Sequence, residues 1–98
     1  MITAAAIIAG VSALVLTVLV VTVLVINVVR KYLESIRASK VNDEVKFVYS
    51  RIEDGNYVTR AGVISSANLQ VSTAKVWKSK DLDPVVKKSL NNVITIRD

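Results

Sequence analysis

The residues of this 98-residue chain that could carry chemistry are its acids and its serines. Asp81 and Asp83 form an Asp-x-Asp pair, a spacing that can coordinate a divalent cation. Because no third acid follows at ligand spacing and Pro84 comes next, we expect both aspartates to act as turn and capping residues. Glu53 and Asp54 are likewise expected to lie in a turn.

Nucleophilic catalysis lacks its usual partners in this sequence. The chain contains no histidine and no cysteine, so it has no imidazole to activate a serine and no thiolate to ligate a metal. No lysine stands at a recognisable Ser-Lys spacing, and the three glycines do not form a phosphate-binding loop. We therefore expect a protein that is not an enzyme and that has neither a cofactor nor a metal site.

Basic side chains interleave with one tryptophan toward the C-terminal end. This pattern is typical of surfaces that contact nucleic acid or anionic lipid, although an ordinary solvated charged face is commoner than either. Lipid headgroups are favoured over nucleic acid, which we expect as a partner only if the protein is viral. The candidate contacts with an anionic partner are Lys75, Trp77, Lys78, Lys80, Lys87 and Lys88.

The elements that would position these residues begin with an uncharged N-terminal run. Residues 2–29 carry no charge, whereas all 13 Lys and Arg and all 8 Asp and Glu lie from Arg30 onward. A helix over this run would be about 42 Å long, more than the roughly 30 Å hydrocarbon core of a bilayer. The run therefore predicts one transmembrane helix, and the absence of a basic segment before it argues against a cleaved signal peptide.

The charges after the run predict its orientation. Only Met1 precedes it, and four basic residues follow within about 15 positions, where the positive-inside bias acts. We expect an integral membrane protein with its N-terminus outside and its C-terminal domain cytoplasmic or on an equivalent inner side. The helix should continue to residue 40, with membrane-surface contacts from Arg30, Lys31, Tyr32 and Arg37.

One face of the predicted span carries small residues about 3.5 positions apart. Such a face would let a second helix approach closely, and an asparagine could bond across the interface. The alternative is that alanine is simply frequent in this region. The packing seam would consist of Ala6, Gly10, Ala13, Thr17 and Asn27.

From Glu44 onward the apolar residues alternate as they do in strands. Asp54-Gly55 suits the turn of a two-residue hairpin. The register of that hairpin would pair Ile52 with Tyr57, Val48 with Ala61, and Val45 with Ile64. A second turn at residues 65–68 should lead to a third strand over residues 69–77.

The remaining elements follow from local signals. The alternation of the third strand slips between Val71 and Ala74, which predicts a bulge. Asp83 as N-cap and Pro84 as first helical residue predict a short helix that ends at residues 91–92. Residues 93–96 are a candidate fourth strand. The expected fold is a single-pass transmembrane α-helix (residues 1–40) followed by a small basic α+β domain (residues 41–98).

Three hypotheses for function remain open. The leading one is a non-catalytic structural or accessory subunit of a multi-protein membrane assembly, whose partners are the lipid bilayer and other membrane subunits or copies of itself. The second is a membrane protein of a virus with an internal lipid layer, linking that membrane to capsid or genome. The third is a regulatory or lipid-binding protein that senses a ligand through its C-terminal part.

Overall fold

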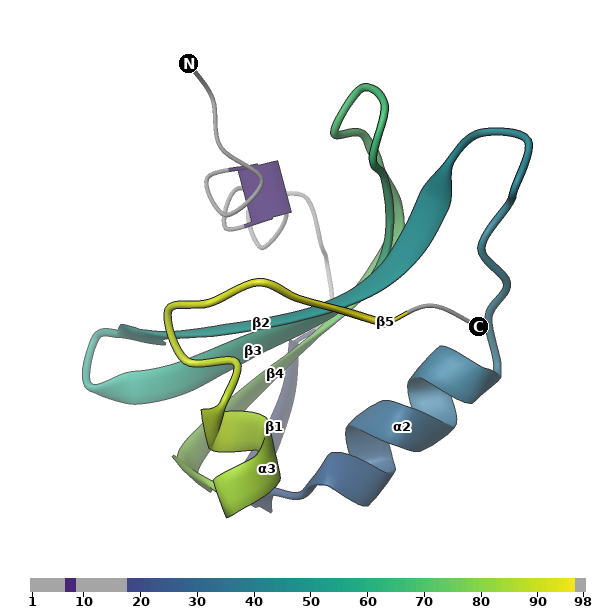
Figure 1. Cartoon of the computed structure of the whole chain (residues 1–98). Helices are drawn as coiled ribbons and strands as arrows, with labels where there is room; N and C mark the ends of the chain where they lie inside the picture. Colours follow the sequence, from purple (N-terminus) through teal and green to yellow (C-terminus); the bar gives the residue numbers. More distant parts are fainter. Residues whose placement is uncertain (1–6, 9–17, 97–98) are drawn as a thin grey trace.

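The computed structural model describes residues 7–8 and 18–96, most of which form a mixed β-sheet with two helices against one face (Figure 1). Across the sheet the strand order is β1-β4-β3-β2-β5. β1 runs parallel to β4, and every other neighbouring pair is antiparallel. In chain order the elements are β1 (Val18–Leu24), α2 (Ile26–Glu34), β2 (Glu44–Glu53), β3 (Asn56–Ser65), β4 (Val71–Leu82), α3 (Pro84–Lys87) and β5 (Ile94–Ile96).

The predicted transmembrane helix is contradicted by this structure. The second half of the uncharged run forms β1, which pairs with β4, and then the first residues of α2. Within residues 7–8 and 18–96, no helix is long and apolar enough to cross a membrane. The expected fold class, the single-pass membrane assignment and the localisation with a cytoplasmic C-terminal domain are therefore wrong, and the chain is a small, mostly-β domain.

The physical reason lies in the composition of β1. Its sequence VLVVTVL consists mainly of β-branched residues, whose restricted side-chain rotamers favour strands over helices outside a bilayer. Pairing with β4 satisfies backbone groups that a membrane span would satisfy within its own helix. An uncharged apolar run is thus compatible with both structures, and its partner strand decides between them.

The hairpin of β2 and β3 is confirmed in its predicted register. Ile52 pairs with Tyr57, Val48 with Ala61, and Val45 with Ile64. Asp54 and Gly55 have φ values of 52° and 78°, as a turn with two left-handed residues requires.

Other local predictions are confirmed in type but not in length. The register of β3 against β4 shifts where Val63 pairs with Thr73 and Ile64 with Val71, as the predicted bulge requires. β4 continues to Leu82, past its predicted end at residue 77. α2 ends at Glu34 rather than residue 40, and α3 at Lys87 rather than residues 91–92.

Hydrophobic clusters cover both faces of the sheet. Because successive side chains of a strand point to opposite faces, Val48 belongs to one cluster and its neighbours Phe47 and Tyr49 to the other. On the face that α2 and α3 cover, called the helical face below, the cluster consists of Leu24, Val29, Leu33, Val48, Ala61, Trp77, Leu82 and Val86. The cluster of the opposite face consists of Ile8, Phe47, Tyr49 and Ile64.

One carboxylate holds the starts of both helices. Asp83 accepts hydrogen bonds from the backbone N–H of Val86 (2.7 Å) and from that of Ile26 (2.7 Å), and its own N–H donates to the carbonyl of Leu24 (3.0 Å). The predicted N-cap is therefore confirmed, and it also fixes the junction between β1 and α2. The hydrogen bond from Val86, followed by that from Ile26, lowers the pKa of Asp83 below its usual value.

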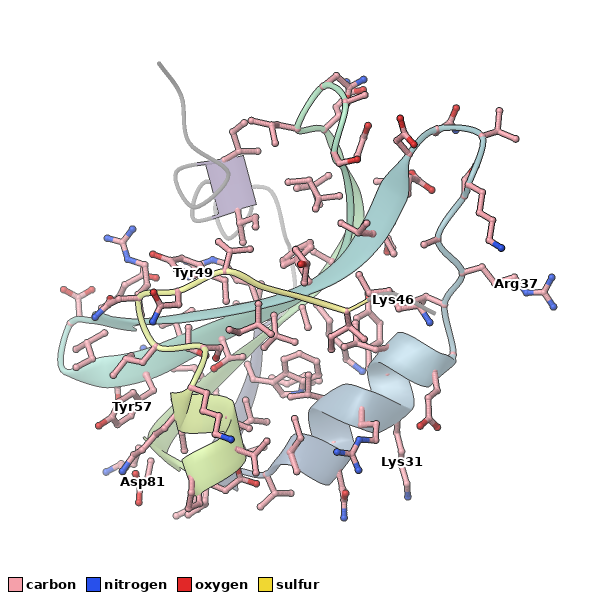
Figure 2. All side chains as sticks on the ribbon, in the orientation of Figure 1. Lys31, Arg37, Lys46, Tyr49, Tyr57 and Asp81 are labelled. Atoms are coloured by element: carbon pink, nitrogen blue, oxygen red, sulfur yellow. The ribbon has the colours of Figure 1, made fainter. Side chains whose placement is uncertain are left out.

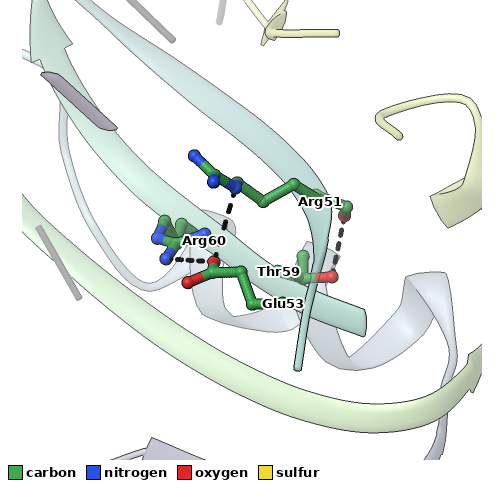
Figure 3. Close-up of polar contacts among 5 residues, drawn as sticks. Arg51, Glu53, Thr59 and Arg60 are labelled. Carbon is green, nitrogen blue, oxygen red and sulfur yellow. Dashed lines mark hydrogen bonds and ion pairs between the residues drawn. The ribbon is translucent and has the colours of Figure 1, made fainter. Parts of the chain in front are cut away.

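A buried chain of hydroxyls fastens the end of α3 to the sheet. The Ser50 Oγ atom lies 2.7 Å from Thr59 Oγ1 and 2.7 Å from Ser89 Oγ, and Ser89 donates to the carbonyl of Val86 at 2.6 Å (the Thr59 contact is drawn in Figure 3). The backbone continues the connection, because Ser50 N–H donates to Ser89 O at 3.0 Å and Asn91 N–H donates to Ser50 O at 2.7 Å. These bonds hold α3 at a set position over β2.

Candidate ligand-binding cleft

A cleft of about 480 Å³ lies on the helical face, between α2, α3, β5 and β2. This volume falls within the range of small-molecule sites in proteins. Most of the wall is aliphatic, and the apolar lining residues are Ile26, Leu33, Val48, Val85, Val86, Ile94 and Ile96. The cleft can therefore accept an apolar chain rather than a strongly hydrated molecule.

Strand register explains how β5 contributes to the cleft. Ile94 pairs with Val48 and Ile96 pairs with Lys46, and directly paired residues project to the same face of a sheet. Both isoleucines consequently lie on the helical face beside the cleft, although they are 38% and 40% exposed. Two partly exposed isoleucines at the mouth of a cleft form an apolar surface that a ligand could cover.

Basic side chains surround the apolar wall. Arg30 comes from α2, Lys46 from β2, and Lys88 follows the last residue of α3. One acid, Glu34, also lines the cleft, so the charged groups sum to a positive excess. An anion placed among them would be attracted more strongly than in bulk water, because the apolar wall lowers the local dielectric.

Lys46 is the least exposed of these cations. Its exposure is 7%, and Figure 2 shows it between β5 and α2. Lysines are rarely buried to this extent without a polar environment for the ammonium group. Together with Ile96 opposite it, Lys46 places a charge next to an apolar side chain within one cross-strand pair.

The candidate anionic-partner residues do not form one surface. Trp77 is only 1% exposed and packs edge-to-face against Tyr32, with ring centroids 5.7 Å apart. The Lys75 ammonium lies 5.4 Å from the Tyr32 ring centre and 5.8 Å from that of Trp77, so it covers this aromatic pair. Of this set the tryptophan belongs to the core.

The other four lysines of the set are distributed over two regions. Lys78 and Lys80 lie on β4 next to β1, with Lys78 paired to Val20. Lys87 lies 3.4 Å from Asp81, and Lys88 lines the cleft. The hydrogen bond from the Leu82 backbone, followed by Lys87, lowers the pKa of Asp81. These six residues therefore share no common surface, and their contact with one anionic partner stays a prediction.

The candidate membrane-surface residues divide in a similar way. Arg30 lines the cleft and Tyr32 packs against Trp77. Lys31 and Arg37 extend into solvent (Figure 2). Of the proposed packing seam, Asn27 is an exposed residue of α2, and the other members lie outside the described residues: Ala6, Gly10, Ala13 and Thr17.

The cleft could not be recognised from the sequence pattern, although the sequence contains one signal for it. Lys46 alternates in phase with Val48 and Ser50, so a lysine occupies a strand position whose neighbours face inward. A charged residue at such a position is unusual enough to indicate a site. The isoleucines of β5 could not be assigned, because their role depends on a pairing with β2.

A second charged cluster lies on the opposite face of the sheet. The buried Arg60 donates from Nη2 to Glu53 Oε2 at 2.6 Å, and Arg51 Nε lies 3.7 Å from the same oxygen (Figure 3). Arg60 is 1% exposed, whereas the Glu53 side chain is 32% exposed, so the guanidinium is buried and its carboxylate partner reaches water. One carboxylate held between two guanidinium groups stabilises the end of the hairpin.

Comparison of the chain with protein-family models, with curated proteins and with solved structures finds no match. Function is therefore inferred from the cleft.

Proposed function

We propose that this protein is a non-catalytic binding module that takes an amphipathic anion, of the class of fatty-acid carboxylates, into the cleft between α2, α3 and β5. One observation carries the proposal: an aliphatic cleft of about 480 Å³ is bordered by three basic side chains and a single acid. The hydrocarbon chain of the ligand occupies the apolar part. Its carboxylate lies near the basic groups.

Burial of the hydrocarbon supplies most of the affinity. Each buried methylene contributes about 0.8 kcal/mol, so a chain of several methylenes can offset the loss of ligand freedom on binding. The isoleucines of β5 and the floor residue Val48 supply the contact surface. An uncharged polar ligand would gain little from these walls.

Charge supplies the selectivity. A hydrogen bond between ionised partners contributes about 1.5–3 kcal/mol, which corresponds to roughly a tenfold or larger change in affinity. Arg30 borders the cleft from α2, Lys88 from the position after α3, and Lys46 from the sheet. The module should therefore prefer a carboxylate to the alcohol of the same length, and reject an amine.

Calorimetric titration of the full chain tests this proposal. The probes are decanoate, decanol and decylammonium, each kept below the concentration at which it self-associates. We expect decanoate to bind at least tenfold more tightly than decanol, and decylammonium to bind more weakly than either. Equal binding of the three would contradict the role of charge, and absence of decanoate binding would refute the function.

Two matched pairs of variants locate the site. Lys46→Met should weaken decanoate at least tenfold, whereas Lys31→Met, at an exposed position of α2 that does not line the cleft, should leave it unchanged. Ile96→Asp should abolish binding, whereas Thr95→Asp, which pairs with Phe47 on the opposite face, should not. Equal effects within either pair would place the ligand elsewhere.

The accessory-subunit and viral hypotheses stay predictions, because no finding tests the assemblies in which they place the protein. Both had assumed a membrane anchor, which the structure contradicts. The third hypothesis, a ligand-binding protein, is the one that the cleft supports.

A further inference from the structure

The two edges of the sheet differ in how they are protected. At one edge β5 contains three residues, which is too short to template a long partner strand. At the other edge β1 contains seven residues, and within residues 7–8 and 18–96 no strand pairs with its outer side. Among the described residues, the outer backbone groups of β1 are therefore available to a further strand.

The side chains of β1 leave the same edge apolar. Four are substantially exposed: Val18 (39%), Leu19 (36%), Val20 (76%) and Val23 (47%). Proteins usually protect an edge strand with a lysine, a proline or a bulge, and β1 has none of these between its first and last residue. A long, uncharged and unprotected edge is the surface expected of a strand that pairs with another chain.

We propose that β1 pairs antiparallel with β1 of a second copy of this chain, so that the two sheets join into one continuous sheet. A twofold axis at Val21 places Val21 opposite its own copy, Val20 opposite Thr22, and Leu19 opposite Val23. Every pair consists of uncharged, mainly β-branched residues, which are favourable cross-strand neighbours. β1 contains no charged residue, so this pairing brings no like charges together.

The size of this interface sets the expected strength. Seven paired residues extend over about 23 Å, and one strand pair buries less surface than the roughly 1,200–2,000 Å² of stable complexes. The dimer should therefore be of the weaker, reversible class, with a dissociation constant on the order of micromolar. The cleft lies between α2, α3, β2 and β5, and β4 and β3 separate β1 from these two strands, so dimerisation leaves it open.

Sedimentation velocity of the full chain over a range of concentrations tests the dimer. The chain should move from monomer to dimer as its concentration passes through the micromolar range. Val20→Lys should weaken the dimer at least tenfold, because two added ammonium groups then lie near the axis. Val28→Lys, at a valine of α2 that is 42% exposed, is the matched control and should dimerise like the parent.

Cysteine cross-linking tests the strand register. The chain has no cysteine, so a disulfide formed by a single-cysteine variant must join two chains. Single cysteines placed from Leu19 to Val23 should cross-link most rapidly at or next to Val21, where the two copies are closest. Val41→Cys, at a position that is 95% exposed and lies outside β1, measures random collision.

Three results would overturn the proposal. One is a chain that stays monomeric at every concentration up to about 1 mM. Another is a dimer that Val20→Lys leaves intact. The third is cross-linking in β1 no faster than at Val41. Because none of these measurements uses a ligand, a failed dimer and a failed ligand site are distinguishable.

Discussion

At Gly62 the close approach of β3 and β4 leaves no room for a side chain. A Cβ atom at this residue would lie 2.0 Å from the carbonyl oxygen of Thr73 and 2.7 Å from Cα of Ala74. Both obstacles are backbone atoms, which cannot move aside as a side-chain end can. Since carbon and oxygen normally stay about 3.3 Å apart, Gly62→Ala must displace β3 from β4 by about 1 Å.

That displacement determines the expected loss. Ladder hydrogen bonds near 2.9 Å would lengthen to about 4 Å, beyond the range in which they hold. Losing two such bonds costs about 2 kcal/mol, and the remaining steric strain adds about 1–3 kcal/mol. Domains of this size are stable by about 5–15 kcal/mol, so Gly62→Ala should lose a large part of that stability.

Urea unfolding followed by tryptophan fluorescence provides the assay. Trp77 is the one tryptophan of the chain and is buried in the helical-face cluster, so its emission reports on the core. Gly55→Ala is the matched control: nothing lies within 4 Å of its Cβ, but φ is +78°, so it should cost only about 1 kcal/mol. A loss of stability no larger for Gly62→Ala than for Gly55→Ala would contradict a steric conflict between β3 and β4.

Two further predictions concern buried hydroxyls and pH. Ser50→Ala removes the centre of the hydroxyl chain and should lower the free energy of unfolding by about 1–3 kcal/mol. Ser79→Ala should be neutral or stabilising, because the buried Ser79 hydroxyl has no hydrogen-bond partner among the described residues. Urea midpoints of the two variants check this, and equal losses would contradict it. The lowered pKa of Asp83 means that its carboxylate is stabilised in the folded state. The resulting contribution to folding stability is present above the unfolded pKa near 3.9, and it is lost as pH falls through the lower folded pKa. Asp83→Asn should therefore be less stable than the parent at pH 7, and the difference should shrink in urea titrations below about pH 4; a difference independent of pH would contradict the assignment.

Local elements of the fold could be predicted from the sequence because their signals are local. Asp54-Gly55 requires a turn of one kind, and that turn aligns every pair of β2 and β3. Asp83 and Pro84 define the start of α3 for the same reason. In each case the residues that decide the structure lie within a few positions of one another.

The N-terminal run could not be assigned in this way. Its lack of charge predicts burial without saying whether lipid or protein surrounds it. β1 becomes a strand because it pairs with β4, where Val18 lies opposite Val76 in a distant part of the chain. Hydropathy averages contain no information about that pairing, and for this reason they led to the membrane interpretation.

The cleft was missed for a related reason. Its lining comes from α2, β2, α3 and β5, which a sequence pattern does not bring together. The candidate contacts with an anionic partner lie close together along the chain, but the fold separates them: Trp77 enters the core, whereas Lys88 lines the cleft. Lys46 is the one cleft residue that the sequence places as a charge at an inward strand position.

The most direct test of the cleft as a ligand site is a methyl NMR titration of the full chain with decanoate. Saturable shifts are expected for the methyl groups of Val48, Val86 and Ile94, with Ile64 on the opposite face unchanged. Shifts centred on Ile64 or on β1, or no shifts at all, would contradict a ligand site in the cleft.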